Sequence, residues 1–480
     1  MKNEETAIAL CAVGAEKVVS NELKHLGITV LDTSFGRVRF FASIENLYRA
    51  LFCLRVADRV LIEAARYPAQ DFDLMFDNAG NVEWEKYIPG GMGVVVSKTR
   101  TNRSKLDDER TIQAMIHKAV ADRLCKHYGV ERLPEDGKIA DIRVYIEKDM
   151  VSIMLDISGD PLFKRGYRIE GGVAPLRETT AAAILLLSGW RRKFPLYDPF
   201  CGSGTIAIEA AMFAWDMAPG VGRKFAIADL VIADDTIERT IRKELLARVD
   251  FSRRIRIGGS DSDPAAVEAA RANMLRAEAL AKGGNAVPAT TSATAPAKTV
   301  TIKVSGARPV KKPVVARFPH QPAFRLLPME NTSAPEDEGE GFIVTNPPYG
   351  NRMGNTSEAE AVYQRMAHLR SRFPAWKLAV ITDHTGFESH FGRKADAVRQ
   401  ITNGATQTYL YVFNNDSSIG ASRKPAAPDP FSAQDDRAGR FERTGQTEHT
   451  GQDAQSGRTE QTEQTGQGGP TGHTGQDEHD

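Results

Sequence analysis

The sequence has few cysteines and no long run of apolar residues. Its 480 residues include four cysteines, which stand far apart and form no Cys-x-x-Cys pair: Cys11, Cys53, Cys125 and Cys201. That spacing argues against a zinc site or a disulfide framework and favours a reducing compartment. The sequence has no run of about 18 apolar residues, and its first five residues lack the apolar core of a signal peptide. We therefore expect a cytoplasmic protein with no membrane segment and no metal centre.

The chain also has no excess of charge of either sign. Lys and Arg total 62, and Asp and Glu total 62. A surface that binds nucleic acid must therefore be a local patch, because the net charge of the protein is zero. The length predicts two or three domains, since one domain usually takes about 100–200 residues.

The most informative stretch that is present runs from Asp198 to Thr205 and reads Asp-Pro-Phe-Cys-Gly-Ser-Gly-Thr. The apolar residues before it predict a short buried strand, and the Ala/Ile-rich run after it predicts a helix packed on a sheet. Gly202 and Gly204 would let a ligand touch bare backbone, and the start of the helix offers unpaired N–H groups. A Gly-x-Gly turn by itself is equally compatible with a plain strand-to-helix connection.

A second motif, Asn346-Pro347-Pro348-Tyr349, follows an apolar segment that predicts a strand. Asn346 would then stand at the carboxyl end of a strand, where open α/β sheets bind ligands. The prolines remove backbone donors and leave the Asn346 side chain and the Pro347 carbonyl as acceptors. The Tyr349 ring can stack on a flat heterocycle.

An acid also follows a third predicted strand, at residues 255–260. The carboxylate of Asp261 can accept both ribose hydroxyls of an adenosine, whereas Asp263, next to Pro264, is expected to cap the following helix. Asp261 lies far more than 20 residues beyond Gly204, and this spacing argues against a nicotinamide Rossmann site.

Together these motifs resemble the class I S-adenosylmethionine-dependent methyltransferases that modify exocyclic amino groups. More closely, residues 6–413, apart from one insertion, resemble the THUMP-domain RNA guanine-N2 methyltransferases, in particular the bacterial branch that acts on 23S ribosomal RNA. The resemblance implies an α/β fold with a Rossmann-like methyltransferase domain, a mostly parallel seven-stranded sheet, and preceding ferredoxin-like and THUMP α+β domains. It implies S-adenosylmethionine as cofactor and ribosomal or transfer RNA as partner, and leaves the oligomeric state open.

The same resemblance gives domain bounds and site residues. It implies a ferredoxin-like lobe at 1–67, a THUMP domain at 68–165 and a methyltransferase domain at 166–415, with a basic insertion at 282–322 and a polar, disordered tail at 416–480. The catalytic residues would be Asn346, Pro347 and Tyr349. The cofactor would be bound by Thr179, Asp198, Pro199, Cys201, Gly202, Gly204, Thr205 and Asp261. Pro328 replaces an Asp that the family places beside adenine, so Glu330 or backbone groups would take over that contact.

Two groups of basic residues are candidates for RNA binding. The first precedes a predicted helix at 107–127 and contains Lys98, Arg100, Arg103 and Lys105. Phosphate oxygens could meet both side chains and helix N–H groups there. Charge alone favours a solvated loop balanced by the neighbouring acids, and the resemblance to a THUMP domain is what favours RNA. The second contains Lys164, Arg165 and Arg168, for which an ion-pair cluster at a domain interface is the alternative.

Other functions share parts of this pattern. A DNA amino-methyltransferase can carry Asn-Pro-Pro-Tyr, but this chain lacks a large target-recognition region. A protein-glutamine methyltransferase is disfavoured by the basic segment at 164–168. A ribosome-assembly factor that binds RNA without catalysis is disfavoured by the intact motifs, although Pro328 departs from them.

Overall fold

The computed structural model describes residues 5–168, 176–284, 314–315, 321–335, 339–348 and 356–415. All of them belong to one structural unit, Met1–Ala433. Tyr349, most of the basic insertion and the predicted disordered tail lie outside the described residues. None of the described helices is long and apolar enough to cross a membrane.

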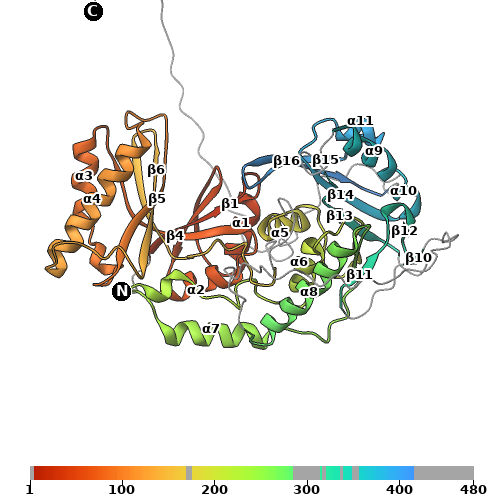
Figure 1. Cartoon of the computed structure of the whole chain (residues 1–480), viewed down its shortest axis with the longest axis horizontal. Helices are drawn as coiled ribbons and strands as arrows, with labels where there is room; N and C mark the ends of the chain where they lie inside the picture. The colour runs from red at the N-terminus through yellow and green to blue at the C-terminus, as the bar shows by residue number, and fades with distance from the viewer. Residues whose placement is uncertain are drawn as a thin grey trace, which may run out of the picture. The chain divides into compact units, whose positions relative to one another are not determined.

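The first third of the chain builds one seven-stranded sheet, seen in red to orange in Figure 1. Its strand order is β2-β3-β1-β4-β7-β6-β5. The strands are β1 (Glu5–Cys11), β2 (Val30–Ser34), β3 (Arg37–Ala42), β4 (Ala57–Pro68), β5 (Gly93–Asn102), β6 (Ile139–Glu147) and β7 (Met150–Asp156). The sequence pattern does not predict β2 or β4, and β4 pairs with β1 on one side and β7 on the other. The predicted lobe and THUMP domain thus share one sheet, and the boundary between them stays a prediction.

Four helices accompany this sheet: α1 (Glu16–His25), α2 (Ile44–Cys53), α3 (Phe72–Asn81) and α4 (Glu109–Tyr128), with a 3₁₀ turn at Trp84–Lys86. Their starts follow local capping chemistry. Ser43 accepts the N–H of Asn46 at α2, and Asp108 accepts the N–H of Arg110 at α4. In Figure 1, α3 and α4 lie side by side next to β5 and β6.

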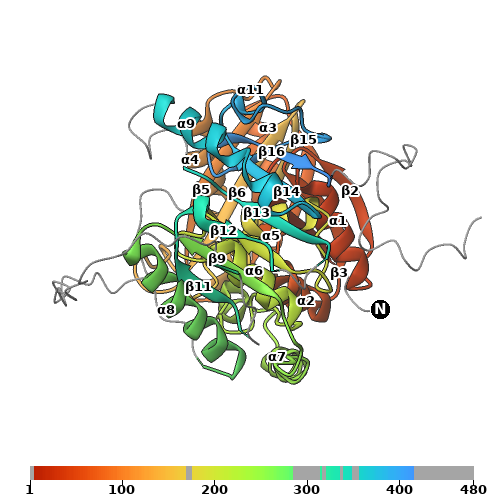
Figure 2. The ribbon, with the colours of Figure 1, turned by 90° about the vertical axis from the view of Figure 1, so that its right-hand side faces the viewer.

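A second seven-stranded sheet has the order β11-β9-β8-β13-β14-β16-β15. Its strands are β8 (Leu196–Asp198), β9 (Ile257–Asp261), β11 (Ala323–Leu326), β13 (Gly341–Thr345), β14 (Trp376–Thr382), β15 (Ala397–Asn403) and β16 (Thr406–Phe413). The first five are parallel, and β16 runs antiparallel between β14 and β15. Figure 2 shows the succession from β16 through β14, β13 and β9 to β11. This confirms the predicted fold class. The short strands β10 (Val314–Val315) and β12 (Thr332–Ser333) pair separately.

Helices cover both faces of the second sheet, which is why its strands are apolar on both sides. On β14, Ala379 and Ile381 join the core shared with α5 (Glu178–Leu187), α6 (Thr205–Ala214) and α8 (Pro264–Ala281). Leu378 and Val380 join the opposite core with α9 (Thr356–Met366), α10 (Leu369–Arg372) and α11 (Phe387–Phe391). Helix α7 (Asp235–Ala247) and 3₁₀ turns at Ala226–Asp229 and Met329–Asn331 complete the described elements.

Backbone groups of the amino-terminal lobe contact the hairpin of β15 and β16. The Val13 N–H donates to Thr402 Oγ1 at 3.0 Å, and the Thr402 N–H donates to the Val13 carbonyl at 3.1 Å. Gly14 lies against the same hairpin with φ +92°, and a Cβ built there would be 2.0 Å from the Gln400 carbonyl oxygen. Glycine is required at this contact because any side chain would force the two segments apart.

We therefore expect Gly14→Ala to lower the free energy of unfolding more than Gly27→Ala does. Both glycines have positive φ, and a Cβ added to Gly27 would have no atom within 4 Å. Each variant should lose about 1–2 kcal/mol from its left-handed backbone, and Gly14→Ala should lose at least about 1 kcal/mol more through the clash. Denaturant titration of the two variants measures the difference; equal losses would mean that the contact with the hairpin does not hold the lobe.

Candidate active site

The glycine turn begins where β8 ends. Asp198 is the last residue of β8, and α6 starts at Thr205. The Cys201 N–H donates to the Ser260 carbonyl at 2.9 Å, and the Gly204 N–H donates back to the Cys201 carbonyl at 2.8 Å. Gly204 is the N-cap of α6, and no side chain caps that end. The first N–H groups of α6 are therefore available to a ligand.

The two glycines of the turn have different surroundings. Gly202 has φ +51°, and a Cβ built on it would have no protein atom within 4 Å. Gly204 has φ +84°, and its Cβ would lie 3.0 Å from Ala270 on α8 and from Phe324 on β11. Open space thus lies beside Gly202, as access by a ligand requires. Close packing of α6 is a further reason for glycine at Gly204, and contact of either glycine with the cofactor stays a prediction.

A carboxylate stands on each side of this turn. Asp261 ends β9, where its Oδ2 accepts the Gly202 N–H at 2.9 Å and its Oδ1 accepts the Asp263 N–H at 3.0 Å. Each oxygen keeps a lone pair with which it can accept a ligand hydroxyl. Asp263 caps α8 by accepting the Ala265 N–H, as predicted.

The Asn-Pro-Pro segment is fixed to the glycine turn by a buried hydrogen bond. β13 pairs with β8, and Thr345 Oγ1 donates to Asp198 Oδ1 at 2.6 Å. Asp198 also accepts the Phe200 N–H at 3.1 Å. Burial raises the pKa of Asp198 to about 7, and the bonds from Thr345 and Phe200 oppose that rise.

Asn346 follows β13 directly, at the carboxyl edge of the sheet. Its Oδ1 is buried, and no hydrogen-bond donor among the described residues reaches it. A buried acceptor without a donor is unusual in a native structure and calls for an explanation. Pro347 is buried next to it, so this edge presents acceptors and few donors.

Comparisons with known proteins agree with this geometry. A family model described as the RMKL-like methyltransferase domain matches residues 165–283 and 324–411, and one described as the RlmL ferredoxin-like domain matches residues 6–61. YpsC of Bacillus subtilis (strain 168), whose name describes an RNA methyltransferase, is 30% identical over 412 residues, which cover 85% of this chain and 95% of YpsC. The chain belongs to the RMKL-like methyltransferase family.

Two further proteins are similar to this chain. The Ribosomal RNA large subunit methyltransferase K/L of Syntrophotalea carbinolica is 32% identical over 413 residues, which cover 84% of this chain and 52% of that protein. The chain thus spans about half the length of the K/L relatives. The crystal structure of SMU.472, described as a methyltransferase complexed with SAH, has a TM-score of 0.72 and 31% identity, and covers 86% of this chain and 99% of that one.

The cofactor of this methyltransferase is S-adenosylmethionine, and the residues of the turn fit it. The open space beside Gly202 and the free N-terminus of α6 could receive the amino acid end. The spare lone pairs of Asp261 suit the ribose hydroxyls. Burial raises the pKa of the Cys201 thiol far above its usual range, so Cys201 would contribute backbone and not a thiolate.

Other predicted cofactor residues already have protein partners. Thr179 on α5 donates its hydroxyl to Asp58 of the amino-terminal lobe at 2.5 Å, and Thr205 accepts from Arg168 at 2.7 Å. Glu330 forms a 2.9 Å ion pair with Arg365 of α9. Pro199 is buried behind the turn. The contacts of these four residues with the cofactor stay predictions.

The predicted RNA-binding residues are less free than the sequence suggested. Strand β5 extends to Asn102, so Lys98 and Arg100 lie on a strand and not in a loop; Arg100 pairs with Glu109 at 2.6 Å. Lys105 donates to Gln70 at 2.9 Å. Arg103 lies exposed beyond β5.

The second group forms an interface cluster, which was the alternative interpretation. Arg165 is 2% exposed and pairs with Glu209 of α6 at 3.4 Å, so the prediction that it contacts RNA is wrong. Arg168 pairs with Glu178 of α5 at 3.1 Å, and Lys164 pairs at the surface with Asp160 at 2.8 Å.

Sequence reasoning also missed a cluster at the carboxyl end of β14. Glu360 Oε1 lies 3.3 Å from His384 Nε2 and 3.3 Å from His390 Nε2, and the three groups could hold a metal ion by their spacing. The Gly386 N–H, however, donates to His384 Nδ1 at 3.1 Å. That bond leaves the proton of neutral His384 on Nε2, which then donates to Glu360 and cannot bind a metal. Spacing along the chain gave no signal, because Glu360 stands 24 residues before His384.

Substitutions of the two glycines should separate binding from folding. Gly202→Ala adds a methyl group where only the ligand would be, so it should leave the melting temperature within a few degrees and weaken S-adenosylmethionine binding at least about tenfold. Gly204→Ala should chiefly destabilise the protein, because its methyl group meets Ala270 and Phe324. Calorimetric titration and thermal unfolding test both. Undiminished affinity in folded Gly202→Ala would remove the turn from the cofactor site.

Asp198 should make stability depend on pH. Its pKa is raised from 3.8 to about 7, so between about pH 4 and 7 the folded protein binds a proton that the unfolded chain does not. The stability of the wild type therefore falls as pH rises through this window. Relative to the wild type, Asp198→Asn should gain on the order of 1–3 kcal/mol between pH 5 and pH 8. Urea unfolding without cofactor at both pH values measures this gain, with exposed Asp136→Asn as control; parallel behaviour of wild type and Asp198→Asn would disprove it.

Proposed function

We propose that this protein is an RNA methyltransferase that transfers a methyl group from S-adenosylmethionine to the exocyclic N2 of a guanine in 23S ribosomal RNA. The observation that carries the proposal is the buried Oδ1 of Asn346, which has no donor among the described residues. An amino group is the donor that such an acceptor lacks. The names of YpsC and of the K/L relatives support RNA, and in the latter case ribosomal RNA, as the substrate.

Two acceptors at the edge of the sheet would align the amino group. Asn346 Oδ1 and the Pro347 carbonyl each accept one N–H of the guanine, and this turns the nitrogen lone pair toward the glycine turn. The hydrogen bond between Thr345 and Asp198 holds the two motifs at a constant separation. Tyr349, which lies outside the described residues, would stack on the flipped base.

Methyl transfer depends on correct placement of the reacting nitrogen more than on a strong base. S-adenosylmethionine supplies a methyl group bonded to a positively charged sulfur. The sulfur is a good leaving group because it departs as a neutral thioether. The N2 lone pair, oriented by Asn346 and the Pro347 carbonyl, would attack in line, so that a C–N bond forms as the C–S bond breaks. The neutral thioether would leave, and one amino proton would pass to water. Correct placement of the nitrogen therefore supplies most of the acceleration.

Removal of the acceptor should reduce the rate far more than it reduces binding. Asn346→Ala should keep its affinity for cofactor and RNA within a few-fold and lose about 10²-fold or more in single-turnover rate. Asn346→Asp retains an acceptor oxygen and should retain more of the rate. The assay follows labelled methyl transfer to ribosomal RNA from a strain that lacks the enzyme. Wild-type rates in Asn346→Ala would refute the catalytic role.

The nature of the product is tested in the same strain. Mass mapping of its ribosomal and transfer RNA should reveal one guanine that has lost its N2 methyl group. A change confined to transfer RNA would replace 23S RNA as the substrate, and a wild-type enzyme that methylates no cellular RNA would favour an assembly factor without catalysis.

A further inference from the structure

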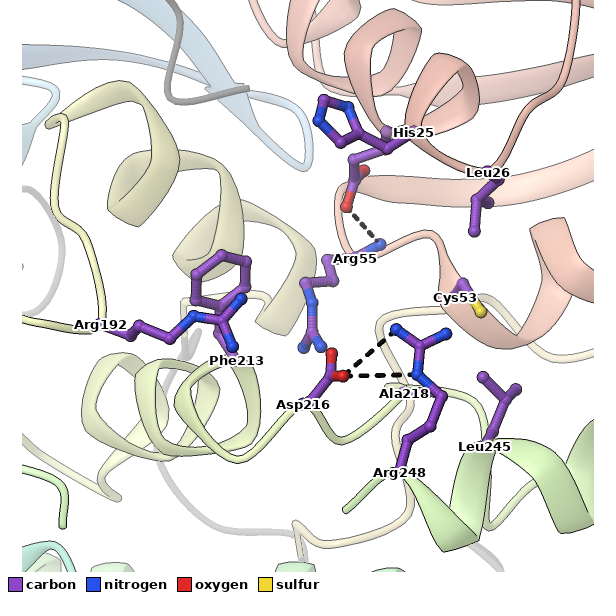
Figure 3. Close-up of a pocket in the computed structure, with 11 residues that line it drawn as sticks. His25, Leu26, Cys53, Arg55, Arg192, Phe213, Asp216, Ala218, Leu245 and Arg248 are labelled. Atoms are coloured by element: carbon purple, nitrogen blue, oxygen red, sulfur yellow. Dashed lines mark hydrogen bonds and ion pairs between the residues drawn. The ribbon is translucent and has the colours of Figure 1, made fainter. Parts of the chain in front are cut away.

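A basic cleft lies between the amino-terminal lobe and the methyltransferase domain. A cavity of about 190 Å³ is lined by His25 of α1 and Arg55 after α2 on one side, and by Phe213 of α6 and Arg248 after α7 on the other. Figure 3 shows these side chains around one space, with Arg192 reaching in beside Phe213. A neighbouring cavity of about 490 Å³ shares His25, Arg192 and Phe213 and adds Trp190, Arg191 and Lys193. We call the two cavities together the interlobe cleft.

The interlobe cleft is remote from the glycine turn. Helix α6 starts at Thr205, beside that turn, and carries Phe213 in its last turn. Ten helical residues rise about 15 Å. Residues 190–193 precede β8, so they lie at the amino edge of the sheet, whereas Asn346 lies at the carboxyl edge. A ligand in the interlobe cleft would therefore not take part in the chemistry itself.

The charges that line the interlobe cleft do not balance. Its cations are Arg55, Arg191, Arg192, Lys193 and Arg248, and its acids are Glu22 and Asp216. Asp216 pairs with Arg248 at 3.2 Å. Glu22 turns inward and accepts the backbone N–H groups of Arg55 and Val56, and burial raises its pKa to about 7. In the part of the chain that the structure describes, no carboxylate forms an ion pair with Arg191, Arg192 or Lys193.

Phe213 holds two of these guanidinium groups in place. Arg55 lies over its ring at 5.2 Å and Arg192 at 5.5 Å. Such cation–π contacts restrict the side chain but leave the planar N–H donors free for another partner. Arg55 is further anchored by its bond to the Met217 carbonyl at 2.6 Å. The cleft is thus organised before any ligand arrives.

We propose that the interlobe cleft binds backbone phosphates of the RNA substrate. Guanidinium groups recognise phosphate oxygens through paired N–H donors, and a surface with unbalanced cations collects such anions. The inference rests on the proposed function for its choice of RNA over an acidic protein. It also offers cations in place of the two predicted groups, because five of the seven RNA-binding residues predicted from sequence already contact protein groups.

The test compares two double variants with equal loss of charge. Arg191→Ala with Arg192→Ala removes two cations of the cleft, and Arg239→Ala with Lys243→Ala removes two exposed cations of α7 outside it. The first should weaken binding of unmodified 23S RNA about tenfold at physiological salt and lower the slope of log affinity against log salt by about 1.4–1.8. Its single-turnover rate at saturating RNA should match the wild type, because the cleft lies far from the methyl transfer. The second should change neither the affinity nor the slope.

The outcomes separate this inference from the proposed function. If the wild type methylates RNA and the cleft variant keeps its affinity and slope, the inference is overturned and the proposed function stands. Equal weakening in both variants would also overturn it, because general charge and not the cleft would then attract RNA. If the cleft variant loses RNA affinity and slope while a wild type that binds RNA transfers no methyl group, the cleft is supported and the proposed function fails.

Discussion

One buried hydrogen bond connects the two motifs on which this protein depends. Thr345 donates to Asp198 across 147 residues of sequence, and the pairing of β13 with β8 aligns the two strand ends beneath it. The glycine turn and Asn346 can therefore meet at one edge of the sheet although long segments separate them in the chain. The bond satisfies one carboxylate oxygen in a site where burial raises the pKa of Asp198 to about 7. Loss of the threonine hydroxyl would leave that carboxyl without its nearest donor.

The amino-terminal lobe contacts a helix next to the glycine turn. Asp58 accepts from Thr179 on α5 and pairs with Arg177 at its start, while Arg165 and Tyr167 both contact Glu209 on α6. Breaking a buried ion pair by removing one partner typically costs about 3–5 kcal/mol. The two helices next to the glycine turn are thus held by Asp58 of the lobe and by residues 165–177 at the start of the methyltransferase domain. The lobe thus contributes to the framework of the candidate active site.

Sequence motifs predicted the methyltransferase half well, because each motif has a local cause. Glycine at a positive φ, an acid at the end of β9 and Asp263 before Pro264 all act within a few residues of where they stand. The failures concern properties that only tertiary packing decides. Burial of Arg165 depends on Glu209, which is 44 residues away, and nothing near Arg165 signals it. Strand β4 was not predicted, because its buried and partly exposed residues do not alternate regularly. It pairs with two different strands, β1 and β7, along its length. The interlobe cleft joins residues that no spacing rule would group.

The long strand β4 has a consequence for how such proteins can be recombined. Residues Ala57–Ile62 pair with β1, and residues Leu61–Pro68 pair with β7. A cut at residue 67 or 68 would give the first fragment an unpaired strand edge and would strip β7 of its central neighbour. We therefore expect exchange of modules between relatives to require that everything from β1 to β7 is inherited together, although the sequence predicts two domains within it.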